Sequence, residues 1–123
     1  MIHDVPVPSA RPRPPPPQQV RQQTRDGKVV PLDVRETPEW RAGHASDALH
    51  LPLSRLMAGA SLPAAARDKP VVTICRSGRR SQQAVKVPAG RGVEATDVAG
   101  GMTAWTRAGL PVTSEGGSGG GIA

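Results

Sequence analysis

The chain's single cysteine lies in the segment whose residues are best suited to chemistry. Cys75 follows an apolar run at residues 71–74, and three arginines lie within five residues of it: Arg76, Arg79 and Arg80. The thiolate is the nucleophilic form of cysteine, and a helix N-terminus beside cations stabilises it. A buried structural cysteine is the alternative, but unpaired arginine is rarely buried. We therefore predict nucleophilic chemistry at Cys75, acting on an anionic substrate.

The elements around Cys75 are predicted to place it at the end of a strand. Residues 71–74 (VVTI) form the strongest strand candidate, and ligands of open α/β sheets bind beyond the carboxyl ends of strands. Gly78 permits a tight loop, and successive N–H groups in such a loop can converge on an anion. We expect a helix to follow Arg80 and to end near Val87, because Pro88 would clash with the helix.

The rest of the chain alternates between strand and helix signals. Strands are expected at 29–34, 49–51 and 95–98, the first with Pro31 better suited to a sheet edge. Thr37 and Ser54 are expected to cap short helices. A further helix is expected to begin at Gly100-Gly101 and to contain Trp105. It should end just before Gly109, its C′ residue, with Pro111 beyond. The alternation predicts an α/β fold, with a small, mainly parallel sheet and short helices on both faces.

Composition divides the chain into three parts. Among 123 residues, seven of the 14 prolines lie in the first 17 positions, and five of the 14 glycines lie at 116–121. We expect residues 1–26 to be disordered, 27–112 to form the domain and 113–123 to be a flexible tail. The proline run is interpreted as a solvated linker, with docking into an SH3-like groove as the alternative.

Several classes of protein are disfavoured by composition. One cysteine excludes an internal disulfide and any multi-thiolate metal site, and no other residues have metal-ligand spacing. No apolar run approaches the roughly 20 residues that span a bilayer, and no secretory signal is visible. We therefore expect a cytoplasmic protein that needs no cofactor or metal. The net charge of +6 suggests nucleic-acid binding, but the matching motifs and stacking aromatics are missing.

Four motifs in register carry a family resemblance. They are Asp33-Val34-Arg35-Glu36, Glu39-Trp40-x-x-Gly43-His44, Cys75-Arg76-Ser77-Gly78-Arg79-Arg80-Ser81, and Gly100-Gly101-Met102-x-Ala104-Trp105-x-x-Ala108-Gly109-Leu110-Pro111. Over residues 32–112 the chain resembles single-domain rhodanese-like sulfurtransferases. The resemblance implies a three-layer rhodanese-like fold.

The resemblance also implies a sulfur-transfer reaction. Cys75 would be the nucleophile that takes sulfane sulfur from an anionic donor such as thiosulfate and holds it as a persulfide. The substrate-binding loop would consist of Arg76, Ser77, Gly78, Arg79, Arg80 and Ser81, whose amides cradle the outer sulfur. The acceptor would be cyanide or a thiol, on a small molecule or a protein. Since the chain has no second cysteine to resolve the persulfide, the acceptor must be external.

The other motif residues are interpreted as structural. We expect Asp33 and Arg35 to form an ion pair and His44 to be a hydrogen-bonded loop histidine. Trp105 is expected in the core, and Gly100-Gly101 lacks the surroundings of a phosphate loop.

Two further functions stay open. A rhodanese-like interaction module with an idle cysteine is the main alternative. A cysteine phosphatase or arsenate reductase is less favoured, because the Cys-x5-Arg pattern would place its arginine at Ser81.

Overall fold

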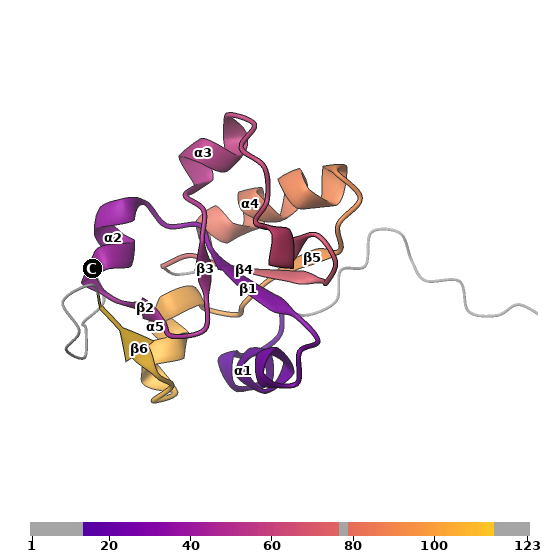
Figure 1. The fold of residues 1–123 in the computed structure, drawn as a ribbon. Helices are drawn as coiled ribbons and strands as arrows, with labels where there is room; N and C mark the ends of the chain where they lie inside the picture. Colours follow the sequence, from indigo (N-terminus) through magenta and orange to yellow (C-terminus); the bar gives the residue numbers. More distant parts are fainter. Residues whose placement is uncertain (1–13, 77–78, 115–123) are drawn as a thin grey trace, which may run out of the picture.

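A four-stranded parallel sheet lies at the centre of the molecule (Figure 1). The computed structural model describes residues 14–76 and 79–114, with the backbone alone at 79–83. The strands are β1 (Val30–Asp33), β3 (Leu49–His50), β4 (Val71–Ile74) and β5 (Ala95–Asp97), in the order β3-β1-β4-β5. β1 and β4 pair along their full length, from Val30 opposite Val71 to Asp33 opposite Ile74. The predicted parallel α/β architecture is confirmed.

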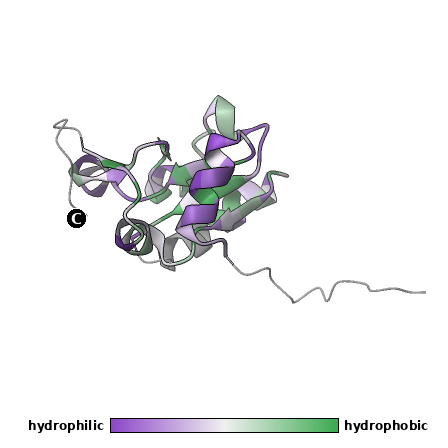
Figure 2. Ribbon diagram, turned by 90° about the horizontal axis from the view of Figure 1, so that it is seen from below, coloured by the Kyte–Doolittle hydropathy of each residue, from purple (hydrophilic) through white to green (hydrophobic). Residues whose placement is uncertain are grey.

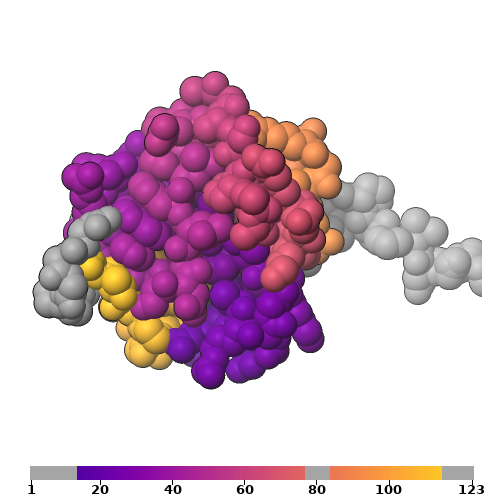
Figure 3. All heavy atoms as spheres, in the orientation of Figure 1, coloured from indigo at the N-terminus to yellow at the C-terminus, as the bar shows by residue number. Residues whose placement is uncertain are grey.

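Helices cover both faces of this sheet (Figure 1). On one face lie α3 (Leu53–Met57), the 3₁₀ turn η1 (Ala64–Ala66) and α4 (Arg79–Gly90). On the other lie α1 (Pro17–Arg25) and α5 (Gly101–Arg107). Beside the sheet, α2 (Thr37–Ala42) leads into β2 (His44–Ala45), which pairs antiparallel with β6 (Val112–Thr113). Figure 3 shows the yellow C-terminal segment with β6 beside the purple segment with α2 and β2.

Each face of the sheet has its own apolar cluster, and the hydrophobic strands in Figure 2 lie behind more hydrophilic helices. The cluster under α3 and α4, here called the cysteine-side cluster, contains Val30, Leu32, Val34, Leu51, Leu56, Leu62, Ala66, Val71, Cys75 and Ala84. The cluster under α1 and α5, the tryptophan-side cluster, contains Val20, Ala45, Val72, Ile74, Val98, Met102 and Trp105. Trp105 therefore provides the bulk that phenylalanine and tyrosine supply in other small cores.

The domain begins earlier than expected. The segment predicted to be disordered contains α1, whose Val20 is fully buried in the tryptophan-side cluster. Pro17 starts this helix at a position where proline is favourable, and the carbonyl of Pro15 accepts a hydrogen bond from the amide of Ala99. Val20 is the only apolar residue after Pro17 in α1, so no helical period was visible in the sequence. Residues 1–13 and 115–123 lie outside the described part, and the disorder expected there stays a prediction.

Two helix caps differ from the expected ones. Glu36, not Thr37, is the N-cap of α2, because Glu36 and Glu39 form a reciprocal capping box. Pro52, not Ser54, is the N-cap of α3. Ser54 lies inside α3, and its hydroxyl donates to Glu36 Oε1 at 2.8 Å, which links the starts of the two helices.

Pro31 lies in an inner strand, not at the expected edge. β1 lies between β3 and β4 in the sheet. The amides of Val30 and Val34 both donate to carbonyls on the β4 side, so the backbone nitrogen of Pro31 points toward β3. Pairing with the two-residue β3 begins only at Leu32, one residue later. The missing donor of Pro31 therefore interrupts no ladder.

α4 differs from its expected bounds at both ends. It begins at Arg79, two residues before the expected start, and continues through Pro88 to Gly90. Pro88 lies in the last turn, where only the bond to the Ala84 carbonyl is lost. Its own carbonyl accepts from the amides of Arg91 at 3.0 Å and Val93 at 2.9 Å, which ends the helix. Burial of the Pro88 ring compensates part of the cost.

Replacing Pro88 by alanine should stabilise the domain. Pro88→Ala supplies an amide donor for the Ala84 carbonyl and removes the ring clash. We expect the thermal midpoint to rise by about 4–8 °C, the change that about 1 kcal/mol produces in a domain of this size. Differential scanning calorimetry measures it. Pro63→Ala, at the residue before η1, controls for the entropy that any lost proline returns to the unfolded chain, and should not raise the midpoint. An unchanged or lower midpoint in Pro88→Ala would contradict the account.

Candidate functional site

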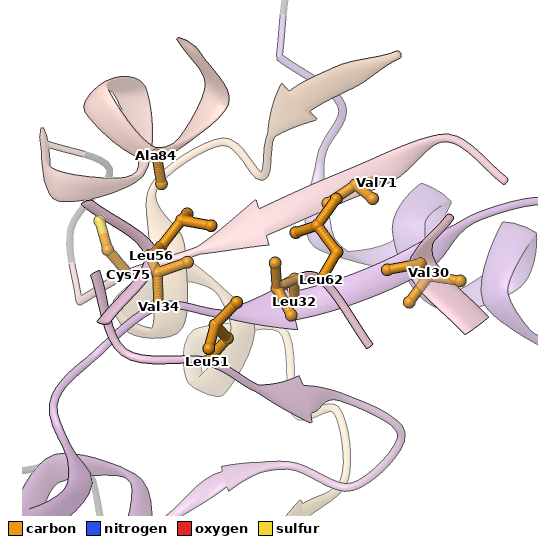
Figure 4. Close-up of a cluster of buried hydrophobic side chains, with 10 residues drawn as sticks. Val30, Leu32, Val34, Leu51, Leu56, Leu62, Val71, Cys75 and Ala84 are labelled. Carbon is orange, nitrogen blue, oxygen red and sulfur yellow. The ribbon is translucent and has the colours of Figure 1, made fainter. Parts of the chain in front are cut away.

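Cys75 follows β4 directly, at the carboxyl end of the parallel sheet. Its side chain is only 1% exposed and belongs to the cysteine-side cluster. In Figure 4 Cys75 lies at the edge of the labelled cluster, on the side of Val34, Leu56 and Ala84. The thiol therefore occupies the expected strand end and is also part of the apolar core.

The start of α5 holds the backbone of the cysteine loop. The amide of Met102 donates to the Cys75 carbonyl at 2.7 Å, and the amide of Thr103 donates to the Arg76 carbonyl at 2.9 Å. The Thr103 hydroxyl donates to the same Arg76 carbonyl at 2.9 Å. Three hydrogen bonds thus fix the two residues that begin the loop.

Gly101 allows this close approach. Its φ is +57°, and a Cβ placed there would overlap the Cys75 carbonyl oxygen and lie 2.8 Å from the Arg76 carbonyl carbon. Gly100, with φ +74°, caps α5 in the left-handed conformation. The Gly-Gly pair therefore positions the cysteine loop, a role that its sequence pattern did not reveal.

The structure describes only part of the expected substrate loop. Arg76 is exposed, whereas Ser77 and Gly78 lie outside the described residues. α4 begins immediately afterwards, and amides in the first turn of a helix have no partner within that helix. Three of the expected cradle residues form this first turn: Arg79, Arg80 and Ser81. Their side chains are not described.

Asp33 and Arg35 form the expected ion pair at the end of β1. Both side chains are fully buried, and Arg35 Nη2 lies 2.9 Å from Asp33 Oδ2. Arg35 Nε also donates to Asp33, and Arg35 Nη2 donates to the Gly43 carbonyl. Among the described residues, Nη1 of Arg35 has no hydrogen-bond partner. The pair ties the end of β1 to the turn that follows α2.

His44 and His50 stack with Trp40 beside this ion pair. The ring centroids of Trp40 lie 3.5 Å from those of His44 and 4.5 Å from those of His50, with nearly parallel planes. His44 Nδ1 hydrogen-bonds the Trp40 carbonyl at 2.7 Å, and His50 Nε2 hydrogen-bonds the Arg35 carbonyl at 2.8 Å. His44 thus lies in β2 and makes a hydrogen bond of the expected kind. Sequence reasoning gave Trp40 no role, although its spacing of four from His44 is a helical-contact signal.

The remaining features of the described residues add no second reactive centre. Trp105 is 2% exposed in the core, and its Nε1 donates to the Pro111 carbonyl at 3.2 Å. Across residues 14–76 and 79–114 there is no group of three or more His, Cys, Asp or Glu arranged to hold a metal ion. Within the same residues, every helix is too short or too polar to cross a membrane.

A family model for the rhodanese-like domain matches residues 16–108. The chain belongs to the rhodanese-like family. The match includes α1, Cys75 and α5, and so agrees with the early domain start that the structure shows.

Several curated relatives of this rhodanese-like domain are named sulfurtransferases. An Allochromatium vinosum sulfurtransferase is 36% identical over 88 residues, covering 70% of this chain and 79% of the relative. The Vibrio cholerae thiosulfate sulfurtransferase GlpE is 33% identical over 85 residues, covering 68% and 78%. An uncharacterized Synechocystis protein is 43% identical over 95 residues, which are 76% of this chain but only 50% of that protein. A Yarrowia lipolytica adenylyltransferase and sulfurtransferase is matched over only 20% of its length. The Allochromatium and Vibrio relatives, which are matched over more than two thirds of their length, support sulfur transfer as the general activity.

Solved structures agree with the fold. A rhodanese-related protein from Thermoplasma volcanium superposes with a TM-score of 0.71 at 29% identity, covering 84% of this chain and 99% of that one. The rhodanese-like domain of an Anabaena protein superposes with a TM-score of 0.69 at 22% identity, covering 85% of this chain and 80% of that one. The three-layer arrangement is therefore that of the family.

Alanine at position 101 should separate α5 from the cysteine loop. Gly101→Ala combines an unfavourable φ with a clash against Cys75 and Arg76, whereas Gly109→Ala has a similar φ of +73° and open space around it. We expect Gly109→Ala to cost about 1 kcal/mol of unfolding free energy and Gly101→Ala at least 2 kcal/mol more. Urea denaturation measures both. Equal losses would show that backbone strain alone, not the contact with the loop, matters at Gly101.

Removing one partner of the buried ion pair should lower the free energy of unfolding more than neutralising both partners. Arg35→Met leaves the Asp33 carboxylate buried without its partner, and we expect a loss of about 3–5 kcal/mol in unfolding free energy. The double variant Asp33→Asn/Arg35→Met leaves no buried charge and should lose clearly less. Urea denaturation of both variants gives the comparison. A double variant as unstable as Arg35→Met would show that packing of the arginine stem, not the charge, dominates.

Proposed function

We propose that this rhodanese-like domain carries sulfane sulfur on Cys75, from an anionic donor such as thiosulfate to an external thiol or to cyanide. The main support is the place of Cys75: it ends β4 and lies four residues before the N-terminus of α4. Loop amides and the first turn of a helix stabilise negative charge there. The sulfurtransferase names of relatives are consistent with this proposal.

The loading step transfers one sulfur atom without any other oxidant. The Cys75 thiolate attacks the outer sulfur of thiosulfate, a sulfur–sulfur bond forms to Cys75, and the bond to the sulfonate sulfur breaks. Sulfite leaves with the bonding electron pair, and the persulfide stays on the protein. Arg76, whose side chain is exposed at the loop, attracts the anionic donor. Cys75 is 1% exposed, and the cysteine-side cluster to which it belongs shields the inner sulfur from water.

The discharge step requires a second molecule. Because Cys75 is the only cysteine in the chain, no internal thiol can attack the persulfide. An acceptor thiolate or cyanide attacks the outer sulfur, and Cys75 leaves as the thiolate that begins the next cycle. The proposed cycle is therefore a two-step exchange with one covalent intermediate.

Intact-protein mass spectrometry tests the loading step. Incubation with thiosulfate should add one sulfur atom, about 32 Da, and subsequent cyanide should remove it and release thiocyanate. Since the chain has one cysteine, the added mass reports on one site. Cys75→Ser is the matched control and should gain no mass.

An unmodified wild-type mass would overturn the proposal. It would leave the rhodanese-like domain as an interaction module whose cysteine takes no sulfur from thiosulfate. Turnover of a phosphoester faster than that of thiosulfate would instead favour phosphatase chemistry at the same loop.

A further inference from the structure

A hollow lies beside the cysteine loop, on the α5 side. It measures about 320 Å³ and is lined by Arg76, Thr103, Thr106 and Arg107. The three residues of α5 are spaced i, i+3 and i+4, which places them on one face of the helix. Helical side chains lean toward the N-terminus, so Arg107 extends back over Thr103 toward the loop. The hollow therefore joins the end of α5 to the residue next to Cys75.

The two arginines give this hollow a positive charge. Arg76 and Arg107 are both exposed, and among the side chains that the structure describes neither forms an ion pair. The hydroxyl hydrogens of the threonines are already used, since Thr103 donates to the Arg76 carbonyl and Thr106 to the Met102 carbonyl, each at 2.9 Å. Only the two guanidinium groups have donors left for a ligand. Guanidinium groups match carboxylates in geometry and charge, so the hollow is suited to a carboxylate.

The hollow and the Cys75 side chain lie on opposite faces of the sheet, which favours a ligand longer than thiosulfate. The Cys75 side chain belongs to the cysteine-side cluster, whereas α5 packs on the opposite face of the sheet through Met102 and Trp105 (Figure 1). A group in the hollow is thus separated from the reacting sulfur by the backbone of the loop. In thiosulfate the sulfonate is bonded directly to the transferred sulfur, whereas a ligand that spans the two faces needs a spacer of several bonds.

We propose that Arg107 and Arg76 form an acceptor subsite, which selects thiols whose carboxylate lies several bonds from the sulfur. This inference rests on the proposed function, and it names the class of acceptor. The bound acceptor thiolate attacks the outer sulfur of the Cys75 persulfide. A sulfur–sulfur bond forms on the acceptor, the bond to Cys75 breaks, and Cys75 leaves with the electron pair. Arg107 is a specificity residue that holds the carboxylate and takes no part in the bond changes.

Steady-state kinetics with two matched acceptors tests the subsite. Glutathione has carboxylates several bonds from its thiol, and glutathione diethyl ester has the same thiol and spacer without those charges. For each enzyme the readout is kcat/KM for glutathione divided by kcat/KM for the ester. We expect Arg107→Gln to lower this ratio about fivefold, as the loss of one partly exposed ion pair of about 1 kcal/mol would.

Arg25→Gln is the matched control. Arg25 is also an exposed arginine in the last turn of a helix, but α1 ends where β1 begins, at the opposite end of the sheet. This variant removes the same charge and should keep the wild-type ratio. Equal ratios in wild type and Arg107→Gln would overturn the subsite. So would slower persulfide formation from thiosulfate in Arg107→Gln with an unchanged acceptor ratio, because the hollow would then serve the donor.

A binding measurement decides the inference even where no sulfur transfer is found. S-methylglutathione keeps the carboxylates and cannot react. Titrated into Cys75→Ser, it should give saturable changes in the amide NMR signals of Thr103 and Thr106, and Arg107→Gln in the same background should weaken the binding about fivefold. Saturable changes that survive Arg107→Gln, or their absence at those amides, would overturn the subsite. Failure of the proposed function would instead show as an unmodified Cys75 mass.

Discussion

The contact between the start of α5 and the cysteine loop is the constraint on which the rest of the site depends. Gly101 lets the α5 backbone approach the carbonyls of Cys75 and Arg76 more closely than any side chain would allow. Met102 and Thr103 then donate their amides to those carbonyls. The same helix anchors itself in the core through Met102 and Trp105. The loop is thus fastened to a buried element, and rigid supports of this kind keep a reactive group in place.

The sheet separates the Cys75 thiol from the exposed arginines near it. The thiol lies on the face covered by α3 and α4, among apolar side chains. Arg76 and Arg107, which line one hollow, lie on the α5 side and are exposed to solvent. Alternate residues of a strand point to opposite faces, so consecutive residues at the end of β4 serve both environments. A buried nucleophile and an exposed charge cluster can therefore be neighbours in sequence without neutralising or desolvating each other.

The sequence was most informative where a single residue type decides the local structure. The apolar run at Val71–Ile74 and Gly109 after the last helix were enough to predict β4, with Cys75 at its end, and the end of α5. The sequence was least informative where the local structure depends on contacts with residues elsewhere in the fold. α1 packs through Pro17 and Val20, without an apolar period along the helix, and Pro31 is accommodated because pairing with the two-residue β3 begins only at Leu32. Glu36 and not Thr37 is the N-cap of α2, because it forms a capping box with Glu39, which N-cap propensities alone do not predict. The hollow could not be predicted from the sequence, because thirty residues lie between Arg76 and Arg107 and only the fold brings them together.

The burial of Cys75 has a consequence for the energetics of the whole domain. Its side chain belongs to the cysteine-side cluster, and close-packed interiors respond to a change of even one methylene-sized group. A persulfide adds a sulfur atom to a member of that core, and overpacking typically costs about 1–3 kcal/mol unless the added group points outward. If Cys75 carries sulfur as proposed, the carrier residue is also a packing residue. The loaded and empty domains would then differ in free energy of unfolding, so the stability of the fold would depend on whether sulfur is bound.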